Sequence, residues 1–220
     1  MILENIDKNI YELAEDADEE LAELFAEIDE TAFINSARIL EAFKENKVSY
    51  TDFADINGYG NYDTGRDKLE AIFAHTLGTE DALVRPQIMS GTNALYLTFT
   101  ALLKHGDTLV SISGKPYDSL LEMVGIIGES SQSLKAHGVK YEQIDLVDNN
   151  FNIPAIASRL AKGDVKLVEI QRSRGYSSRK SLTIEQIEEV IKAIRKVNKD
   201  VIIMVDNCYG ELVETKEPGH

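Results

Sequence analysis

Apolar residues recur at steps of three and four positions through the first part of the chain. The first run comprises Leu13, Ala17, Leu21, Leu24, Phe25 and Ile28. A second run comprises Ala37, Leu40, Ala42 and Phe43. This spacing is typical of one face of a helix, with the intervening Glu and Asp residues on the solvated face. We therefore predict helical structure over residues 3–46, within an N-terminal helical segment that spans residues 1–56.

The pattern changes at residues 57–65, whose sequence is NGYGNYDTG. Glycine and asparagine accept unusual backbone angles, so this composition is typical of a loop. Helical spacing resumes at Arg66 and stops at Gly78, and a glycine is a frequent helix terminator. We predict that a second unit begins at this loop and spans residues 57–220.

Short apolar runs alternate with helical patterns from residue 82 onward. Strands are expected at residues 82–88, 108–113, 139–146, 165–170 and 201–205. Helices are expected at residues 91–103, from about residue 117, at 153–160 and at 184–197. Such alternation predicts an α/β fold with a mostly parallel sheet and helices on both of its faces. Ligands in such folds bind at the carboxyl ends of the strands.

Charge and composition narrow the class of partner. The chain carries 38 acidic and 23 basic residues, for a formal net charge of −15. So acidic a surface argues against nucleic acid or an anionic membrane as a partner, because both require a basic face. Cys208 is the single cysteine, which suits a reducing compartment. The N-terminus lacks an apolar signal core, so we expect a cytoplasmic location.

The segment Ser90-Gly91-Thr92-Asn93-Ala94 follows a predicted strand and opens a predicted helix. The first N–H groups of a helix lack internal partners and lie at the positive end of its dipole, so they can bind a phosphate. Gly91 would allow close approach, and the two hydroxyl groups could add hydrogen bonds. An ordinary helix cap, made by the serine or the threonine, is an equally simple interpretation.

Two further residues follow predicted strand ends. Asp206 ends the apolar run VIIMV, and a carboxylate there would face the ligand crevice. Burying it is costly without a partner, and a protonated pyridine nitrogen would be suitable. Tyr117 lies just after another strand and could stack on a flat ring. Alternatively, the aspartate caps a turn and the tyrosine lies in a surface loop.

Taken together, these motifs resemble the methionine gamma-lyase/cystathionine lyase group, and in particular its aluminium-resistance branch. The resemblance is strongest in GYGNYDTGRDKLEAIFAHTLGTEDALVRPQIMSGTNALYLTF and is supported by VEIQRSRGYSSRKSLTIEQI and VIIMVDNCYGELVETKEP. It covers roughly residues 20–218. The resemblance implies the large domain of a fold-type-I enzyme that uses pyridoxal 5'-phosphate as its cofactor.

The resemblance also implies roles for individual residues. In the family, the cofactor phosphate is bound by the residues that match Ser90, Gly91, Thr92 and Asn93. Tyr117 matches the aromatic that stacks on the ring, and Asp206 matches the carboxylate that pairs with the pyridine nitrogen. Cys208 lies where relatives often carry a small hydroxyl residue, and a buried thiol without chemistry is the simpler interpretation. No metal site is expected.

An assembly with shared sites is a further implication. In the family a tyrosine reaches the cofactor phosphate of the neighbouring subunit, and Tyr59 or Tyr62 would be that residue. Three polar residues follow the fourth predicted strand, Gln171, Arg172 and Arg174, and of these Arg172 is the candidate for a bidentate contact with a substrate carboxylate. The alternative for this arginine is a solvated loop position. We expect a homodimer or homotetramer that acts on a small amino acid.

The implied reaction is elimination from a sulfur-containing amino acid, which releases a thiol, a 2-oxo acid and ammonia. The lysine that forms the family's Schiff base lies downstream of Asp206, and Lys216 falls too early to be assigned to it. We therefore expect this chain to be an inactive fragment of a carbon–sulfur lyase. Alternatives are an aminotransferase or aldolase on the same fold, or a non-catalytic binding protein. A nucleotide binder is disfavoured, because neither GxGxxG nor GxxxxGK[ST] occurs.

Overall fold

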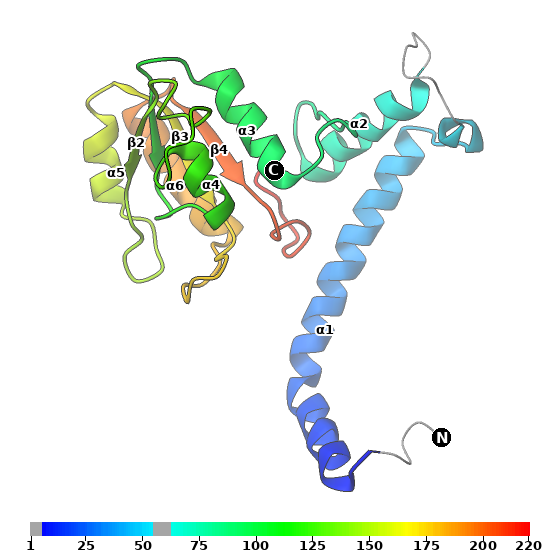
Figure 1. Ribbon diagram of the computed structural model, residues 1–220. Helices are drawn as coiled ribbons and strands as arrows, with labels where there is room; N and C mark the ends of the chain where they lie inside the picture. The colour runs from blue at the N-terminus through cyan, green and yellow to red at the C-terminus, as the bar shows by residue number, and fades with distance from the viewer. Residues whose placement is uncertain (1–5, 55–62) are drawn as a thin grey trace.

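The computed structural model describes residues 6–54 and 63–220 and begins with one long helix. Helix α1 (Lys8–Glu45) is capped by Asp7, whose carboxylate accepts the backbone N–H of Asn9 at 2.8 Å. The predicted N-terminal helix is thus present as a single element, and it extends away from the sheet (Figure 1). Its apolar positions are largely exposed, with Leu13 at 69% and Ile28 at 54%. The spacing therefore predicted the helix but not a buried face within this chain.

A short 3-10 helix, η2 (Tyr50–Phe53), follows α1 and lies against α2 (Thr64–Leu77). Helix α2 is capped by Asp63, whose carboxylate accepts the N–H of Arg66 at 3.0 Å. It ends at Gly78, which has the left-handed φ of 66° that glycine tolerates best. The predicted start near residue 66 and stop at Gly78 are confirmed. The predicted loop tyrosines, Tyr59 and Tyr62, lie outside the described residues.

Four parallel strands form the sheet, in the order β2-β1-β3-β4. They are β1 (Thr108–Ser111), β2 (Lys140–Gln143), β3 (Val165–Gln171) and β4 (Ile202–Asp206). The predicted mostly parallel sheet is confirmed. Because β2 and β3 lie on opposite sides of β1, the strand order changes direction between β1 and β3. A ligand crevice is expected at such a point.

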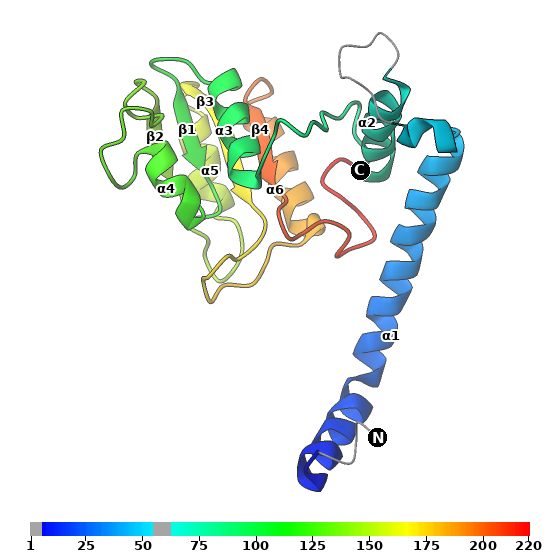
Figure 2. The same ribbon diagram turned by 45° about the vertical axis from the view of Figure 1, so that its right-hand side comes forward.

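Helices cover both faces of the sheet, as predicted (Figure 2). Helices α3 (Gly91–Leu102) and α4 (Asp118–Val124) pack on one face. Helices α5 (Ile153–Leu160) and α6 (Ile184–Val197) pack on the other. This arrangement is that of an α/β domain with its sheet buried between two helical layers.

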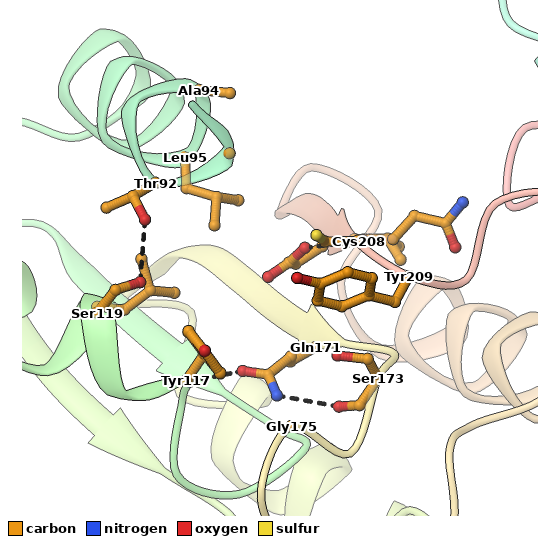
Figure 3. Close-up of a pocket in the computed structure, with 15 residues that line it drawn as sticks. Thr92, Ala94, Leu95, Tyr117, Ser119, Gln171, Ser173, Gly175, Cys208 and Tyr209 are labelled. Carbon is orange, nitrogen blue, oxygen red and sulfur yellow. Dashed lines mark hydrogen bonds between the residues drawn. The ribbon is translucent and has the colours of Figure 1, made fainter. Parts of the chain in front are cut away.

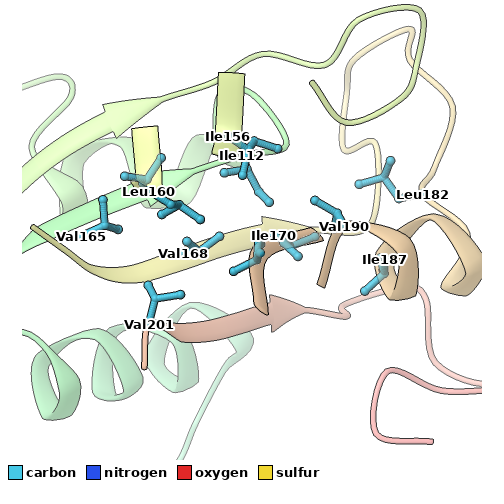
Figure 4. Packing of buried hydrophobic residues seen from close by; sticks show 12 residues of the cluster. Ile112, Ile156, Leu160, Val165, Val168, Ile170, Leu182, Ile187, Val190 and Val201 are labelled. Atoms are coloured by element: carbon cyan, nitrogen blue, oxygen red, sulfur yellow. The ribbon is translucent and has the colours of Figure 1, made fainter. Parts of the chain in front are cut away.

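Alternation along the strands divides the core into two clusters. On β1, Leu109 packs with α3 and α4, whereas Val110 packs with α5 and α6. On β3, Leu167 and Val168 divide in the same way, and all four side chains are at most 1% exposed. Figure 4 shows the cluster on the α5–α6 side. Burial on both faces explains why these strands carry apolar residues at consecutive positions, such as Leu109 with Val110 and Leu167 with Val168.

The strand predicted at residues 82–88 is wrong. This segment is an irregular connection between α2 and α3, with a turn at Pro86 and Gln87. Its Val84 N–H donates to the Glu70 carboxylate at 2.9 Å rather than to a strand. Leu83 remains 69% exposed. An apolar run becomes a strand only where a neighbour pairs with it, and proline removes one of the donors such pairing needs.

The segment after β4 returns towards the N-terminal helices (Figure 1). The buried side chain of Asn35 on α1 donates to the carbonyl oxygens of Leu212 and Glu214 at 2.8 and 3.0 Å. This segment therefore links the sheet to α1. None of the helices in the described ranges combines the length and apolar character needed to span a bilayer.

Candidate cofactor site

A cavity of about 340 Å³ lies at the carboxyl ends of β1, β3 and β4, beside the start of α3 (Figure 3). The parts of the chain that line it are the first turn of α3, the segment after β1 with the start of α4, and the ends of β3 and β4 with the segments that follow them. This is the point at which the strand order changes direction, so the topology alone predicts a ligand crevice there.

The first turn of α3 forms one wall of the cavity. Ser90 caps the helix, and its Oγ accepts the N–H of Asn93 at 3.1 Å. The hydroxyl groups of Thr92 and Ser119 lie 3.0 Å apart (Figure 3). The capping interpretation therefore holds for Ser90. It does not compete with anion binding, because the N–H groups ahead of Asn93 do not take part in this cap.

Open space surrounds Gly91 at the start of this helix. Apart from its chain neighbours and the backbone of its own helix, a Cβ at this position would meet no protein atom within 4 Å, and its φ is not in the left-handed region. Neither backbone strain nor crowding by the protein therefore requires glycine at this position. A glycine beside a cavity and at a helix N-terminus fits a group that approaches the backbone closely, as a phosphate does.

Asp206 lies at the opposite wall, at the end of β4. Its Oδ1 accepts the N–H of Cys208 at 3.0 Å, and the residue is 9% exposed. Burial, and to a smaller degree the charge of Glu211, raises the pKa of the Asp206 carboxyl above its usual value. A buried carboxylate is costly without a cation. A protonated pyridine ring in the cavity would supply that cation, so the residue fits the expected cofactor.

Tyr117 reaches the cavity from the segment after β1. Its N–H donates to Gln171 Oε1 at 2.6 Å, which fixes the segment to the end of β3. Its ring lies 5.7 Å from that of Tyr176, at an interplanar angle of 29°. The hydrogen bond to Tyr176 is the main cause that raises the pKa of Tyr117 to about 12. Tyr117 is therefore a neutral aromatic in the neutral pH range, as a ring-stacking role requires.

The structure brings most of the predicted residues together. Gly91, Thr92, Tyr117 and Asp206 line the cavity described above. Ser90 and Asn93 line an adjacent hollow that shares Thr92 and Ser119 with it. Cys208 also lines the cavity, but the residue is exposed, so the buried thiol expected at this position is wrong. Partial desolvation is the main cause that raises the pKa of this thiol above its usual value. This thiol is thus not activated as a nucleophile.

Arg172 lies apart from this group. Its side chain is buried, and its guanidinium donates to Leu182 O at 3.2 Å, Gly210 O at 2.6 Å and Asn207 Oδ1 at 2.8 Å. It also pairs with Glu214 at 2.5 Å. These contacts replace both expectations for this residue, the substrate contact and the solvated loop. The arginine instead holds the segment after β4 against the end of β3.

Gln171 is a site residue that the sequence did not single out. Besides accepting the N–H of Tyr117, its Nε2 donates to Ser173 O at 2.9 Å, and its own N–H donates to Ser113 Oγ at 2.8 Å. It therefore joins the segments after β1 and β3. The available signal was its place: a polar residue that ends a buried strand faces the crevice, as Asp206 does.

The fold, a parallel sheet between two helical layers, is that of fold-type-I pyridoxal-phosphate-dependent enzymes. The sequence matches the methionine gamma-lyase family over residues 10–220, and the chain belongs to that family. The pyridoxal-5'-phosphate-dependent protein YhfS of Escherichia coli has the same fold, with a TM-score of 0.57 at 17% identity over 83% of this chain and 44% of YhfS.

Closer relatives carry more specific names. A carbon–sulfur lyase involved in aluminium resistance from Clostridium novyi superposes with a TM-score of 0.93 at 38% identity, over 99% of this chain and 53% of that one. A candidate cystathionine beta-lyase involved in aluminium resistance from Clostridium acetobutylicum superposes with a TM-score of 0.93 at 42% identity, over 98% of this chain and 52% of that one. YnbB of Bacillus subtilis is 42% identical over 94% of this chain and 49% of its own. The chain thus spans about half the length of these relatives.

Proposed function

We propose that the complete polypeptide containing these residues is a pyridoxal-phosphate-dependent carbon–sulfur lyase acting on sulfur-containing amino acids, and that this chain supplies its cofactor-binding half. One observation carries the proposal. A buried carboxylate and an open helix N-terminus face each other across a cavity at the point where the strand order reverses. Membership of the methionine gamma-lyase family supports the reaction class.

Each wall of the cavity has a task in this proposal. The first N–H groups of α3, with the hydroxyl of Thr92, bind the cofactor phosphate. Asp206 keeps a proton on the pyridine nitrogen through its negative charge. Tyr117 covers one face of the ring and excludes water from it. When bound, pyridoxal phosphate supplies an electron sink for the electrons left at the substrate alpha carbon.

The phosphate assignment predicts an asymmetric effect of Gly91→Ala. The new methyl group meets open space in the protein, so the free energy of unfolding should be unchanged or slightly higher. The same methyl group would occupy space beside the bound phosphate, so affinity for pyridoxamine 5'-phosphate should fall. Calorimetric titration and urea unfolding of the same preparation measure the two quantities. Unchanged affinity would place the phosphate elsewhere.

The reaction is tested on the complete polypeptide, incubated with pyridoxal phosphate and either L-methionine or L-cystathionine. We expect a thiol and a 2-oxo acid to appear in equal amounts. Amino transfer to an added 2-oxo acid, without thiol, would contradict the lyase assignment and favour an aminotransferase. The absence of both products with either substrate would also contradict it.

A further inference from the structure

Glu169 interrupts the apolar sequence of β3 and is 2% exposed. It lies on the same sheet face as Leu167, towards α3 and α4, two positions before the strand ends at Gln171. Among the described residues, its Oε1 has no hydrogen-bond partner, and no cation lies within ion-pair distance of either oxygen. An ionised carboxylate in such a place would be very costly.

The hydrogen bonds of Ser111 indicate the protonation state of the Glu169 carboxyl group. Ser111 Oγ lies 2.5 Å from Glu169 Oε2 and 2.8 Å from the carbonyl oxygen of Gly114. A serine hydroxyl has one proton, and the carbonyl can only accept. With Glu169 ionised, two acceptors would compete for that single proton. With Glu169 protonated, its acid donates to Ser111 and Ser111 donates to Gly114, so both contacts are satisfied.

On balance, burial and the groups around Glu169 raise the pKa of its carboxyl group, which also favours the neutral form. Burial is the largest influence on the pKa of Glu169, the Ser111 hydrogen bond opposes it, and the charge of Asp206 on β4 adds to it. The net effect raises this pKa to about 7. The Arg179 guanidinium opposes this, but its own hydrogen bonds go to the carbonyl oxygens of Gln171 and Ser173, among others. Tyr141 on β2 is a neutral phenol, because burial raises its pKa as well.

The register of β3 and β4 places Glu169 close to Asp206 of the candidate site. Glu169 pairs with Met204, whereas Asp206 pairs with Gln171, so the two acids are diagonal neighbours on one face of adjacent strands. We propose that Glu169 is held as a neutral acid beneath the site and acts as a positioning residue, which leaves Asp206 as the carboxylate that carries charge towards the cofactor ring. The link to the cofactor rests on the proposed function, whereas the protonation state does not.

The test uses infrared spectroscopy of this chain without ligand, since a protonated carboxyl group has a carbonyl band above the amide bands. We expect a band that disappears in Glu169→Gln and is retained in Glu188→Gln. Glu188 is an exposed carboxylate paired with Lys192 and serves as the matched control. Glutamine has the shape of the neutral acid, and circular dichroism confirms that each variant folds. If Glu169→Gln removes no such band at pH 5.5, the proposal is overturned.

The effect of Asp206 on the protonation of Glu169 is tested by the pH dependence of this band. The band should be lost as the pH rises through about 7, and its midpoint should move to lower pH in Asp206→Asn, because a negative charge has been removed. An unmoved midpoint would overturn the coupling. Bound pyridoxamine phosphate should also lower the midpoint in the wild type, because its protonated ring would offset the negative charge of Asp206. If that ligand fails to bind while the band behaves as expected, the cofactor assignment fails and the neutral acid stands.

Discussion

Replacing Arg172 with leucine is expected to destabilise this chain by roughly 3–5 kcal/mol, because it leaves the fully buried Glu217 without its nearby cation and buried carbonyl oxygens without their donor. The guanidinium is in contact with Glu214 at 2.5 Å and lies 3.9 Å from Glu217, whose side chain is fully buried. It also donates to Gly210 O and so holds the first part of the segment after β4. Urea unfolding followed by circular dichroism measures the change.

The matched control is Arg174→Leu, two residues along the same loop and exposed to solvent. Surface substitutions of this kind usually change the free energy of unfolding by at most about 0.5 kcal/mol. Equal and small effects for the two variants would contradict the structural role given to Arg172. They would restore the alternative in which this arginine is free to contact a substrate.

Asp206→Asn is expected to weaken the binding of pyridoxamine 5'-phosphate by about 30-fold or more. Removing one partner of a buried, hydrogen-bonded charge pair costs roughly 2–5 kcal/mol, and 2 kcal/mol corresponds to about 30-fold. Asparagine keeps the oxygen that accepts the Cys208 N–H, so the loop itself should be retained. Pyridoxamine phosphate is preferable to the aldehyde as a probe, because it forms no adducts with surface lysines.

Asp148→Asn provides the control for this experiment. Asp148 is exposed and has a φ of 51°, a conformation that asparagine tolerates well. The affinity of the Asp148→Asn variant for pyridoxamine 5'-phosphate should equal that of the wild type. If the two variants bind the probe equally well, the ring nitrogen does not pair with Asp206 and the orientation proposed for the cofactor is wrong.

Local signals explain why some elements were predictable to the residue. The predicted helix 184–197 is α6 without change, because Thr183 and Gln186 form a capping box at its start. The predicted helix 153–160 is α5, with the Asn152 side chain as its cap and proline in its first turn. Strands were predictable from apolar runs only where parallel neighbours pair with them, and residues 82–88 lack that pairing among the described residues.

The site was predictable to the extent that it depends on strand ends. Tyr117 follows β1 and Asp206 ends β4, and the parallel sheet brings such positions to one edge. Gly91 was predicted from its place at the start of a helix, although residues 82–88 before it form no strand. The fate of Arg172 was not predictable, because its partners Glu214 and Gly210 lie about 40 positions away in sequence. Glu169 required the sheet register, which no local pattern contains.

The most direct test of the cofactor site is a crystal structure of this chain with pyridoxamine 5'-phosphate. We predict that the phosphate lies at the first N–H groups of α3 beside Gly91. The ring nitrogen should lie within hydrogen-bonding distance of Asp206, with Tyr117 against the face of the ring. A phosphate bound away from α3, or a ring nitrogen directed away from Asp206, would contradict the assignment of this cavity as the cofactor site.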